Sequence, residues 1–194
     1  MHNVFTTDSF ILDSREIGES NKFYRIFTKD LGLINATAQG VRGVKSKLKF
    51  ALQDFSFAKI SFVNGRDVWR ITNAVPNENI FKVLLGDREK LIVFSNITSL
   101  VKKIVSGEER NKPLFDAICS SLSFLSRKNF VRKYIKEVEC ITVLRALHYL
   151  GHLGNSDSFG VFLSPSDWSI ETLIKAKNQR AEIVKWINKS LKEM

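Results

Sequence analysis

Cysteine and long apolar stretches are scarce in this sequence, and each scarcity argues against a class of protein. Only Cys119 and Cys140 are cysteine among 194 residues, and neither belongs to a CxxC pair, so neither a disulfide framework nor a zinc site is expected. Both lie in apolar runs of helical spacing, which indicates reduced core residues. The N-terminal residues lack the basic start and continuous apolar stretch of a signal peptide, and no later segment is long and apolar enough to cross a bilayer. We therefore expect a soluble, cytoplasmic protein without membrane contacts.

Motifs for nucleotide hydrolysis or metal-assisted hydrolysis are also absent. The sequence contains neither GxxxxGK[ST] nor GxGxxG. His148 and His152 stand four residues apart, as two metal ligands on a helix would, but no glutamate follows His148 to complete HExxH. Gly151 and Gly154 indicate that the helix ends there, which favours capping or surface histidines. We expect no catalytic residue, no cofactor and no bound metal.

Acidic residues are outnumbered, and the excess of basic residues points to a polyanionic partner. With 30 Lys and Arg against 20 Asp and Glu, the net charge is +10 and the pI about 9.7. Residues 1–79 carry +3 and the remainder +7, so the basic excess is larger in the second half. The balance favours nucleic acid over an acidic membrane surface. An apolar content of 44% is enough for the core of one domain or two small ones.

The first half of the chain has the pattern of short β-strands separated by turns. Asp30-Leu31-Gly32 and Asn64-Gly65 are hairpin-type turns, and the latter is the strongest short hairpin motif in the chain. Charged residues from Asp13 to Glu16 are expected to end the first strand. The expected strands cover Phe10–Leu12, Lys22–Thr28, Leu33–Ala38, a segment from about Leu52 to Val63, and Asp67–Asn73. Five such strands favour a small closed barrel of the oligonucleotide-binding type, although an SH3-like barrel gives a similar pattern.

Beyond Val75–Asn77 the apolar period changes from that of strands to that of helices. Ser169 begins a capping arrangement, and Asn155–Asp167 is expected to be a loop with a short strand at Phe159–Leu163. Helices are expected over about 91–104, 114–125, 130–150, 169–176 and 179–191. The predicted class is α+β: an N-terminal five-stranded OB-type β-barrel in residues 1–76, followed by an α-helical domain in residues 77–194.

The most informative stretch is a basic loop between the third and fourth expected strands. Gly40 and Gly43 bracket its start, and it carries four cations with no acidic residue between them: Arg42, Lys45, Lys47 and Lys49. Such a loop can neutralise phosphates and release counterions, which gives affinity without sequence preference. The alternative is a solvated loop that only keeps the protein soluble. Lys22, Arg25 and Lys29 would extend the same path along the second strand.

Aromatic residues and a second basic cluster complete the candidate site. Exposed rings on such barrels stack on bases, and Phe50 inside the basic loop is the best candidate, followed by Tyr24. The second cluster lies at a junction between two expected helices and comprises Arg127, Lys128, Arg132, Lys133 and Lys136. It is either a further nucleic-acid contact or the solvated face of a helix, and the pattern does not decide between these readings.

Several short motifs follow one another along the barrel half: Gly18-Glu19-Ser20, Ile26-Phe27-Thr28 followed by Gly32, Ala38-Gln39-Gly40-Val41-Arg42, Lys45-Ser46-Lys47-Leu48, and Leu52-Gln53-Asp54-Phe55. In their order and spacing they resemble the N-terminal domain of the RecO family, the recombination mediators of bacterial DNA repair. The resemblance covers about the first 75 residues well and the helical half in general layout. It places Arg42, Lys45 and Lys47 in the family's basic loop.

The resemblance implies a nucleoid-associated protein that binds single- and double-stranded DNA, anneals complementary strands and helps to load recombinase onto DNA coated by single-stranded DNA-binding protein (SSB). Its implied partners are RecR and the acidic, hydrophobic C-terminal tail of SSB. Many relatives carry a four-cysteine zinc module after the long helix; Asn155–Asp167 has no cysteine, so we predict a helical domain without it. Three alternatives stay open: an OB-fold RNA-binding or translation-associated protein, a protein-interaction adaptor, and, more distantly, an enzyme.

Overall fold

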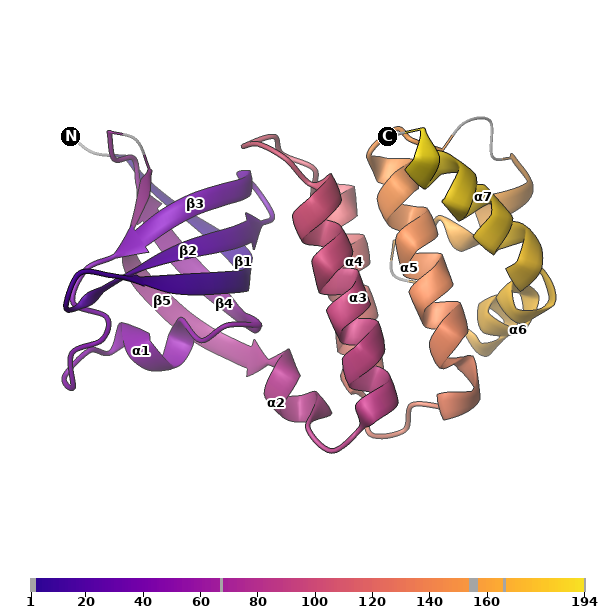
Figure 1. Ribbon diagram of the computed structural model, residues 1–194, viewed down its shortest axis with the longest axis horizontal. Helices are drawn as coiled ribbons and strands as arrows, with labels where there is room; N and C mark the ends of the chain where they lie inside the picture. Colours follow the sequence, from indigo (N-terminus) through magenta and orange to yellow (C-terminus); the bar gives the residue numbers. More distant parts are fainter. Residues whose placement is uncertain (1–2, 67, 154–156, 166, 194) are drawn as a thin grey trace. The chain divides into compact units, whose positions relative to one another are not determined.

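The computed structural model describes residues 3–66, 68–153, 157–165 and 167–193. The chain divides into two compact units, one built on strands and one on helices (Figure 1). The barrel unit comprises Met1–Val83 together with Lys102–Asn111. The helical unit comprises Leu84–Val101 and Lys112–Met194.

Five strands close into a barrel in the order β1-β2-β3-β5-β4. Their bounds are β1 Val4–Ile17, β2 Asn21–Thr28, β3 Gly32–Ala38, β4 Ser56–Val63 and β5 Trp69–Asn79. All neighbouring strands are antiparallel except β3 and β5, which run parallel at Ala36 and Trp69. The prediction of an N-terminal five-stranded OB-type β-barrel followed by helices is confirmed.

The first strand is longer than expected, and the prediction that charged residues end it is wrong. β1 continues through Asp13 and Glu16 to Ile17, pairing with β4 through its first half and with β2 through its second. The register shifts between Ile11 and Asp13, so the buried Leu12 occupies a bulge that bends the strand from one neighbour to the other. Charged side chains fit the second half because one face of a barrel strand meets solvent.

The fourth and fifth strands also differ from their predicted bounds. β4 begins at Ser56 rather than Leu52 because Leu48–Ala51 form a short helix, α1, and Phe55 adopts a positive φ of 65°. β5 starts at Trp69 and continues past Asn73 to Asn79, and the predicted start at Asp67 lies outside the described residues. Pro76 is tolerated within β5 next to a register shift between Phe57 and Ala58, where one backbone donor is dispensable.

A segment that returns from the helices belongs to the barrel unit, and the sequence analysis did not predict it. Leu33 donates its backbone N–H to the carbonyl of Gly107 at 3.1 Å, and Lys102 pairs with Asp13 at 2.9 Å. Gly32 has a φ of 71°, and a Cβ there would collide with the backbone of Glu109. Glycine at this turn therefore serves both the hairpin and the close approach of residues 102–111.

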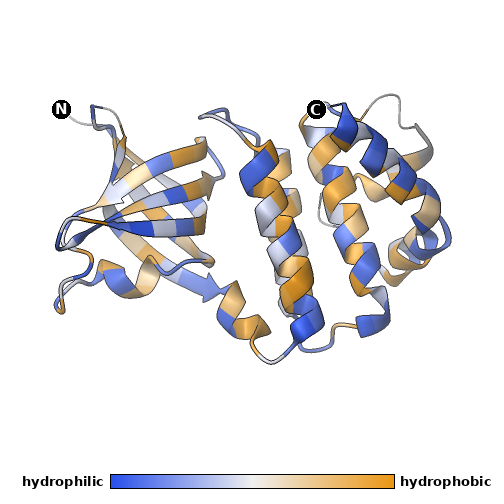
Figure 2. Cartoon of the chain, in the orientation of Figure 1, coloured by the Kyte–Doolittle hydropathy of each residue, from blue (hydrophilic) through white to orange (hydrophobic). Residues whose placement is uncertain are grey.

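Apolar residues recur along the helices of the helical unit, where they are coloured orange in Figure 2, and many of them are buried. Ser169 caps α6 by accepting the backbone N–H of Thr172 at 3.2 Å, which confirms the predicted capping. The helices of the chain after β5 are α2 Ile80–Leu84, α3 Arg88–Ile104, α4 Lys112–Ser126, α5 Ile135–Tyr149, α6 Ile170–Asn178 and α7 Arg180–Lys192. None of the described helices is long and apolar enough to cross a membrane.

Two predictions about the helical half are wrong in detail. The long helix does not begin near Phe130: a 3-10 turn, η1 Arg132–Tyr134, precedes α5. The expected strand at Phe159–Leu163 is instead a 3-10 helix, η2 Asp157–Phe162, which buries Phe159 and Phe162. So short a run of apolar residues fits either conformation, and no neighbouring strand is present among the described residues to pair with it.

Candidate nucleic-acid interface

The basic loop between β3 and α1 is anchored at both ends and projects between them. At its start Val41 is buried in the barrel core, and Gly40 donates its backbone N–H to Asn21 Oδ1 at 2.9 Å. At its end Ala51 and Leu52 are buried. The residues between these two anchors are therefore tied to the barrel at both ends of the loop.

Arg42 is an anchor of this loop rather than a free cation. Its guanidinium donates to the carbonyls of Gly18 and Glu19 at 3.1 and 3.0 Å, and it pairs with Glu16 at 2.9 Å. It thereby ties the loop to the β1–β2 turn. Because its charge is largely compensated by Glu16, Arg42 offers less to a phosphate than the sequence pattern indicates.

The outer part of the loop presents cations and apolar groups together. Lys45, Lys47 and Lys49 are exposed, and Val44 and Phe50 are 99% and 73% exposed. Lys49 and Phe50 lie on α1, so the loop that the sequence predicts is partly helical. Single-stranded nucleic acid is bound by cations that contact its phosphates and by aromatic rings that stack on its unpaired bases. The outer part of the loop presents both kinds of group.

The basic residues of β2 do not form one path. Lys22 lies near the basic loop and donates to Ser14 Oγ at 3.4 Å. Arg25 lies on the other face of β2, where it is paired with Asp13 of β1 in the sheet register and donates to the carbonyl of Lys102 at 2.9 Å. Lys29 lies in the β2–β3 turn, where its backbone N–H donates to Asp8. Lys22 therefore joins the loop, while Arg25 holds residue 102 against the barrel.

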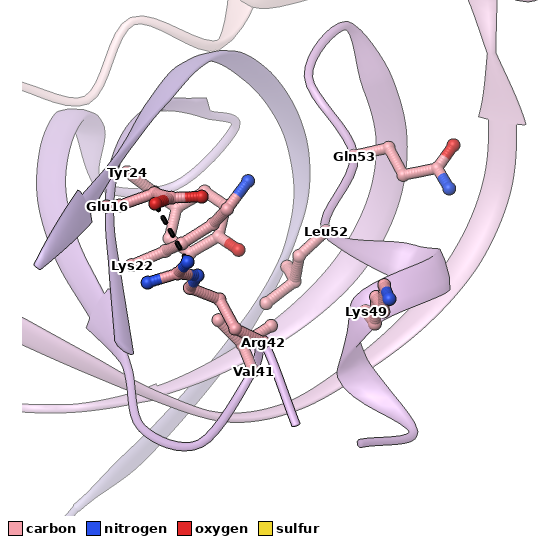
Figure 3. Close-up of a pocket in the computed structure, with 8 residues that line it drawn as sticks. All are labelled: Glu16, Lys22, Tyr24, Val41, Arg42, Lys49, Leu52 and Gln53. Carbon is pink, nitrogen blue, oxygen red and sulfur yellow. Dashed lines mark ion pairs between the residues drawn. The ribbon is translucent and has the colours of Figure 1, made fainter. Parts of the chain in front are cut away.

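Tyr24, the second candidate for stacking on bases, is not exposed. Its side chain is wholly buried in the barrel core, so the expectation of an exposed ring is wrong for Tyr24 while Phe50 fits it. Alternation along β2 places Tyr24 and Ile26 on the inner face. Tyr24 instead lines a pocket of about 310 Å³ beside the loop, together with Lys22, Arg42 and Lys49 (Figure 3).

The second basic cluster lies in the helical unit, and most of its charges have local partners. Arg132 pairs with Asp87 at 3.1 Å, and Arg127 and Lys133 lie over the rings of Phe124 and Tyr134. Lys128 is exposed. Beside the cluster is a largely apolar pocket of about 200 Å³, whose lining includes Phe124, Arg127, Phe130, Val131, Trp168 and Ile170.

Comparisons with known proteins address the same barrel. Residues 1–79 match the family model described as Recombination protein O N terminal. The chain is 31% identical to the DNA repair protein RecO of Alkaliphilus metalliredigens, over 74% of this chain and 54% of that protein. Residues 1–79 therefore carry the N-terminal domain of the RecO family. The chain is 26% identical to DNA repair protein RecO of Desulfitobacterium hafniense, over 77% of this chain and 52% of the relative.

The RecO likeness is incomplete in length, because the chain spans about half the length of the curated relatives it matches. The similarity extends into the helical half. The DNA repair protein RecO of Thermodesulfovibrio yellowstonii is 24% identical over 81% of this chain. In the described part of the chain, no three or more His, Cys, Asp or Glu side chains gather as metal ligands would. His152 is exposed after the end of α5, where Gly151 has a φ of 76°.

The candidate site residues that the sequence did not indicate are those brought together by contacts between distant parts of the chain. The pocket at Tyr24 forms where β1, β2 and the region around α1 meet, and nothing local in the sequence indicates it. The pocket beside Phe124 brings together α4, η1 and the start of α6. An aromatic residue in a strongly basic cluster, as Phe130 is after Arg127, was the available local sign of the second pocket.

Proposed function

We propose that this chain acts as a recombination mediator in DNA repair, binding single- and double-stranded DNA and annealing complementary strands. The barrel unit serves as the OB-fold DNA-binding domain, and the helical unit serves as a RecO-type helical domain without a zinc module. Working with RecR in the cytoplasm, the protein helps to load recombinase onto SSB-coated single strands. Annealing needs no catalytic residue, because a basic surface that holds two strands lowers their repulsion and raises their local concentration.

The observation that carries this proposal is the exposed, basic and aromatic outer part of the loop on an OB-type barrel. Lys45, Lys47 and Lys49 have no acidic neighbour within the loop, and Phe50 presents its ring beside them. The likeness to RecO proteins supports DNA as the polyanion, since the matched relatives are named DNA repair proteins. A competing RNA strand of the same sequence distinguishes this proposal from an RNA-binding role, which requires RNA to displace DNA.

Replacing Lys45, Lys47 and Lys49 together with alanine should weaken binding to single-stranded DNA and flatten its salt dependence. Each phosphate contact on a single strand contributes about 0.7 to the slope of log K against log salt, so losing three contacts should reduce the slope by about 2. Fluorescence anisotropy of a labelled oligonucleotide across a salt series measures the slope. The same variant should anneal SSB-coated complementary strands more slowly than the unaltered protein.

The control removes the same charge elsewhere. Lys175, Lys177 and Lys192 are exposed on α6 and α7 and are replaced by alanine in a second variant. We expect this variant to keep most of the salt slope. An equal loss in both variants would show that net charge, and not the loop, sets the affinity.

We propose that the pocket beside Phe124 takes the acidic, hydrophobic tail of SSB. Its apolar lining, with Trp168 and Phe124 stacked at 5.1 Å between ring centroids, suits a buried aromatic or aliphatic side chain. Arg127 stands at its edge to pair with a carboxylate. Val131 and Ile170, both of which line the pocket, are 44% and 61% exposed, which leaves apolar surface for a partner to cover.

Arg127→Glu should weaken binding of a labelled SSB-tail peptide about tenfold or more, because it replaces an attraction with a repulsion at the pocket edge. Lys128→Glu is the matched control: it makes the same charge change one residue away, and Lys128 does not line the pocket. Peptide anisotropy measures both. Similar losses in the two variants would count against this pocket and favour long-range attraction alone.

A further inference from the structure

The pocket beside the basic loop has an apolar floor and a charged rim. Val41 and Leu52 are each 2% exposed and form the apolar lining with the ring of Tyr24. Figure 3 shows Glu16, Lys22 and Tyr24 on one side, Lys49 and Gln53 on the other, and Leu52 between them. Its volume of about 310 Å³ is within the range of small-ligand pockets, about 300–1,000 Å³.

The Tyr24 hydroxyl has no hydrogen-bond partner among the described residues, although the side chain is wholly buried. In Figure 3 it points from β2 toward the side on which Leu52 lies. Burial, and secondly the charge of Asp54, raise the pKa of Tyr24, so the phenol stays neutral and can both donate and accept. An unpaired buried hydroxyl is costly to folding, so its retention requires an explanation.

The rim of the pocket carries lysines that can contact a phosphate, whereas its carboxylate is already paired and so offers little to a cation. The carboxylate of Glu16 is already paired with Arg42 at 2.9 Å. Lys49 is exposed, and the Lys22 ammonium makes a long hydrogen bond of 3.4 Å to Ser14 Oγ. A flexible lysine stem at this position can move aside and admit a ligand to the hydroxyl, and its ammonium can then contact a phosphate.

We propose that this pocket binds one unpaired base of a single DNA strand, with the polar edge of the base meeting the Tyr24 hydroxyl and its phosphate meeting Lys22 or Lys49. The base faces contact Val41 and Leu52, and Phe50, which is exposed on α1, stacks on a neighbouring base. This inference rests on the DNA binding proposed above and deepens it. Bases in a duplex are paired and stacked, so the pocket gives the protein a preference for single strands that charge alone does not supply.

The test compares Tyr24→Phe with the unaltered protein on a mixed-sequence single strand, an abasic strand of the same length and a duplex of the same length. Affinity for the mixed-sequence strand should fall about threefold to tenfold, the loss expected for one neutral hydrogen bond. Affinities for the abasic strand and the duplex should not change. Gln53→Trp, which fills the pocket from its half-exposed rim, should give the same selective loss.

Stability separates a ligand-binding hydroxyl from a structural one. Because the hydroxyl is unpaired, Tyr24→Phe should leave the thermal unfolding midpoint unchanged or raise it, and a lower midpoint would overturn the inference. Unchanged affinity for the mixed-sequence strand, or an equal fall on the abasic strand, would also overturn it. If the unaltered protein binds the abasic and mixed-sequence strands equally, this inference is wrong but the proposed function stands. If the unaltered protein binds no DNA, the proposed function is wrong as well.

Discussion

Replacing Arg145 with methionine should lower the free energy of unfolding of the helical unit by about 3–5 kcal/mol. Arg145 is wholly buried in α5 and donates to the carbonyls of Phe162 and Asp167, both at 2.7 Å. Methionine occupies a similar volume but donates no hydrogen bond, so both carbonyls lose their partner at about 1–3 kcal/mol each. The variant also loses the contact of the guanidinium with the Trp168 ring, 4.3 Å from its centroid.

Urea unfolding followed by circular dichroism measures this loss as a lower midpoint at an unchanged slope. Arg145→Lys keeps the charge but not the planar fork, so an intermediate loss is expected. Arg127→Met is the matched control, because Arg127 is an exposed arginine over a ring in the same unit; a change within about 0.5 kcal/mol is expected there. Equal midpoints for Arg145→Met and the unaltered protein would contradict the role given to Arg145.

Arg145 matters because it organises a segment that has little regular structure of its own. Tyr149 donates its hydroxyl to the carbonyl of Leu163 at 2.6 Å, and Trp168 donates its indole N–H to Ser120 at 3.3 Å. Burial lowers the pKa of Arg145 to about 10, so the guanidinium remains charged near neutral pH. Side chains of α4 and α5 thus fix the described residues between α5 and α6, a segment whose sequence contains no cysteine.

The barrel is predictable from sequence where its signals are local. Gly32, Asn64 and Gly65 mark turns by their backbone preferences, and strand residues between them alternate in polarity. The ends of β1 and β5 are not predictable in this way. β1 continues past Asp13 because β2 still offers a partner there, and β5 continues through Pro76 because β4 does. The ends of both strands therefore depend on pairing with residues that are distant in the sequence.

The candidate site divides along the same line. A run of cations without carboxylates is local, so Lys45 and Lys47 could be singled out from sequence, and both are exposed. The partner of Arg42 is Glu16, and the burial of Tyr24 depends on the closure of the barrel, so neither is visible in the loop itself. Arg145 is an intermediate case: a lone arginine among apolar helical residues indicates burial, but not which carbonyls it meets.

Replacing Arg180 with methionine should lower the free energy of unfolding by about 3 kcal/mol, whereas Glu137→Met should be neutral or slightly stabilising. The two side chains pair at 3.1 Å between Arg180 Nη1 and Glu137 Oε1, with Arg180 44% exposed and Glu137 only 1% exposed. Removing Arg180 leaves a carboxylate buried without a counterion, which is costly. Removing Glu137 leaves an arginine that water can solvate, and it eliminates the Oε2 atom that has no partner among the described residues.

The double variant Glu137→Met with Arg180→Met tests this asymmetry in one thermodynamic cycle. Since the buried charge is absent from it, its stability should return to within about 1 kcal/mol of the unaltered protein, giving a large coupling between the two substitutions. Methionine is a good helix former at both positions, so the cycle reports the ion pair and not helix propensity. If Glu137→Met loses as much stability as Arg180→Met, the pair contributes net stability, and the carboxylate is held for its energy and not merely tolerated. If neither substitution has an effect, Glu137 is reached by water in solution, and the packing of α5 against α7 is looser than its burial indicates.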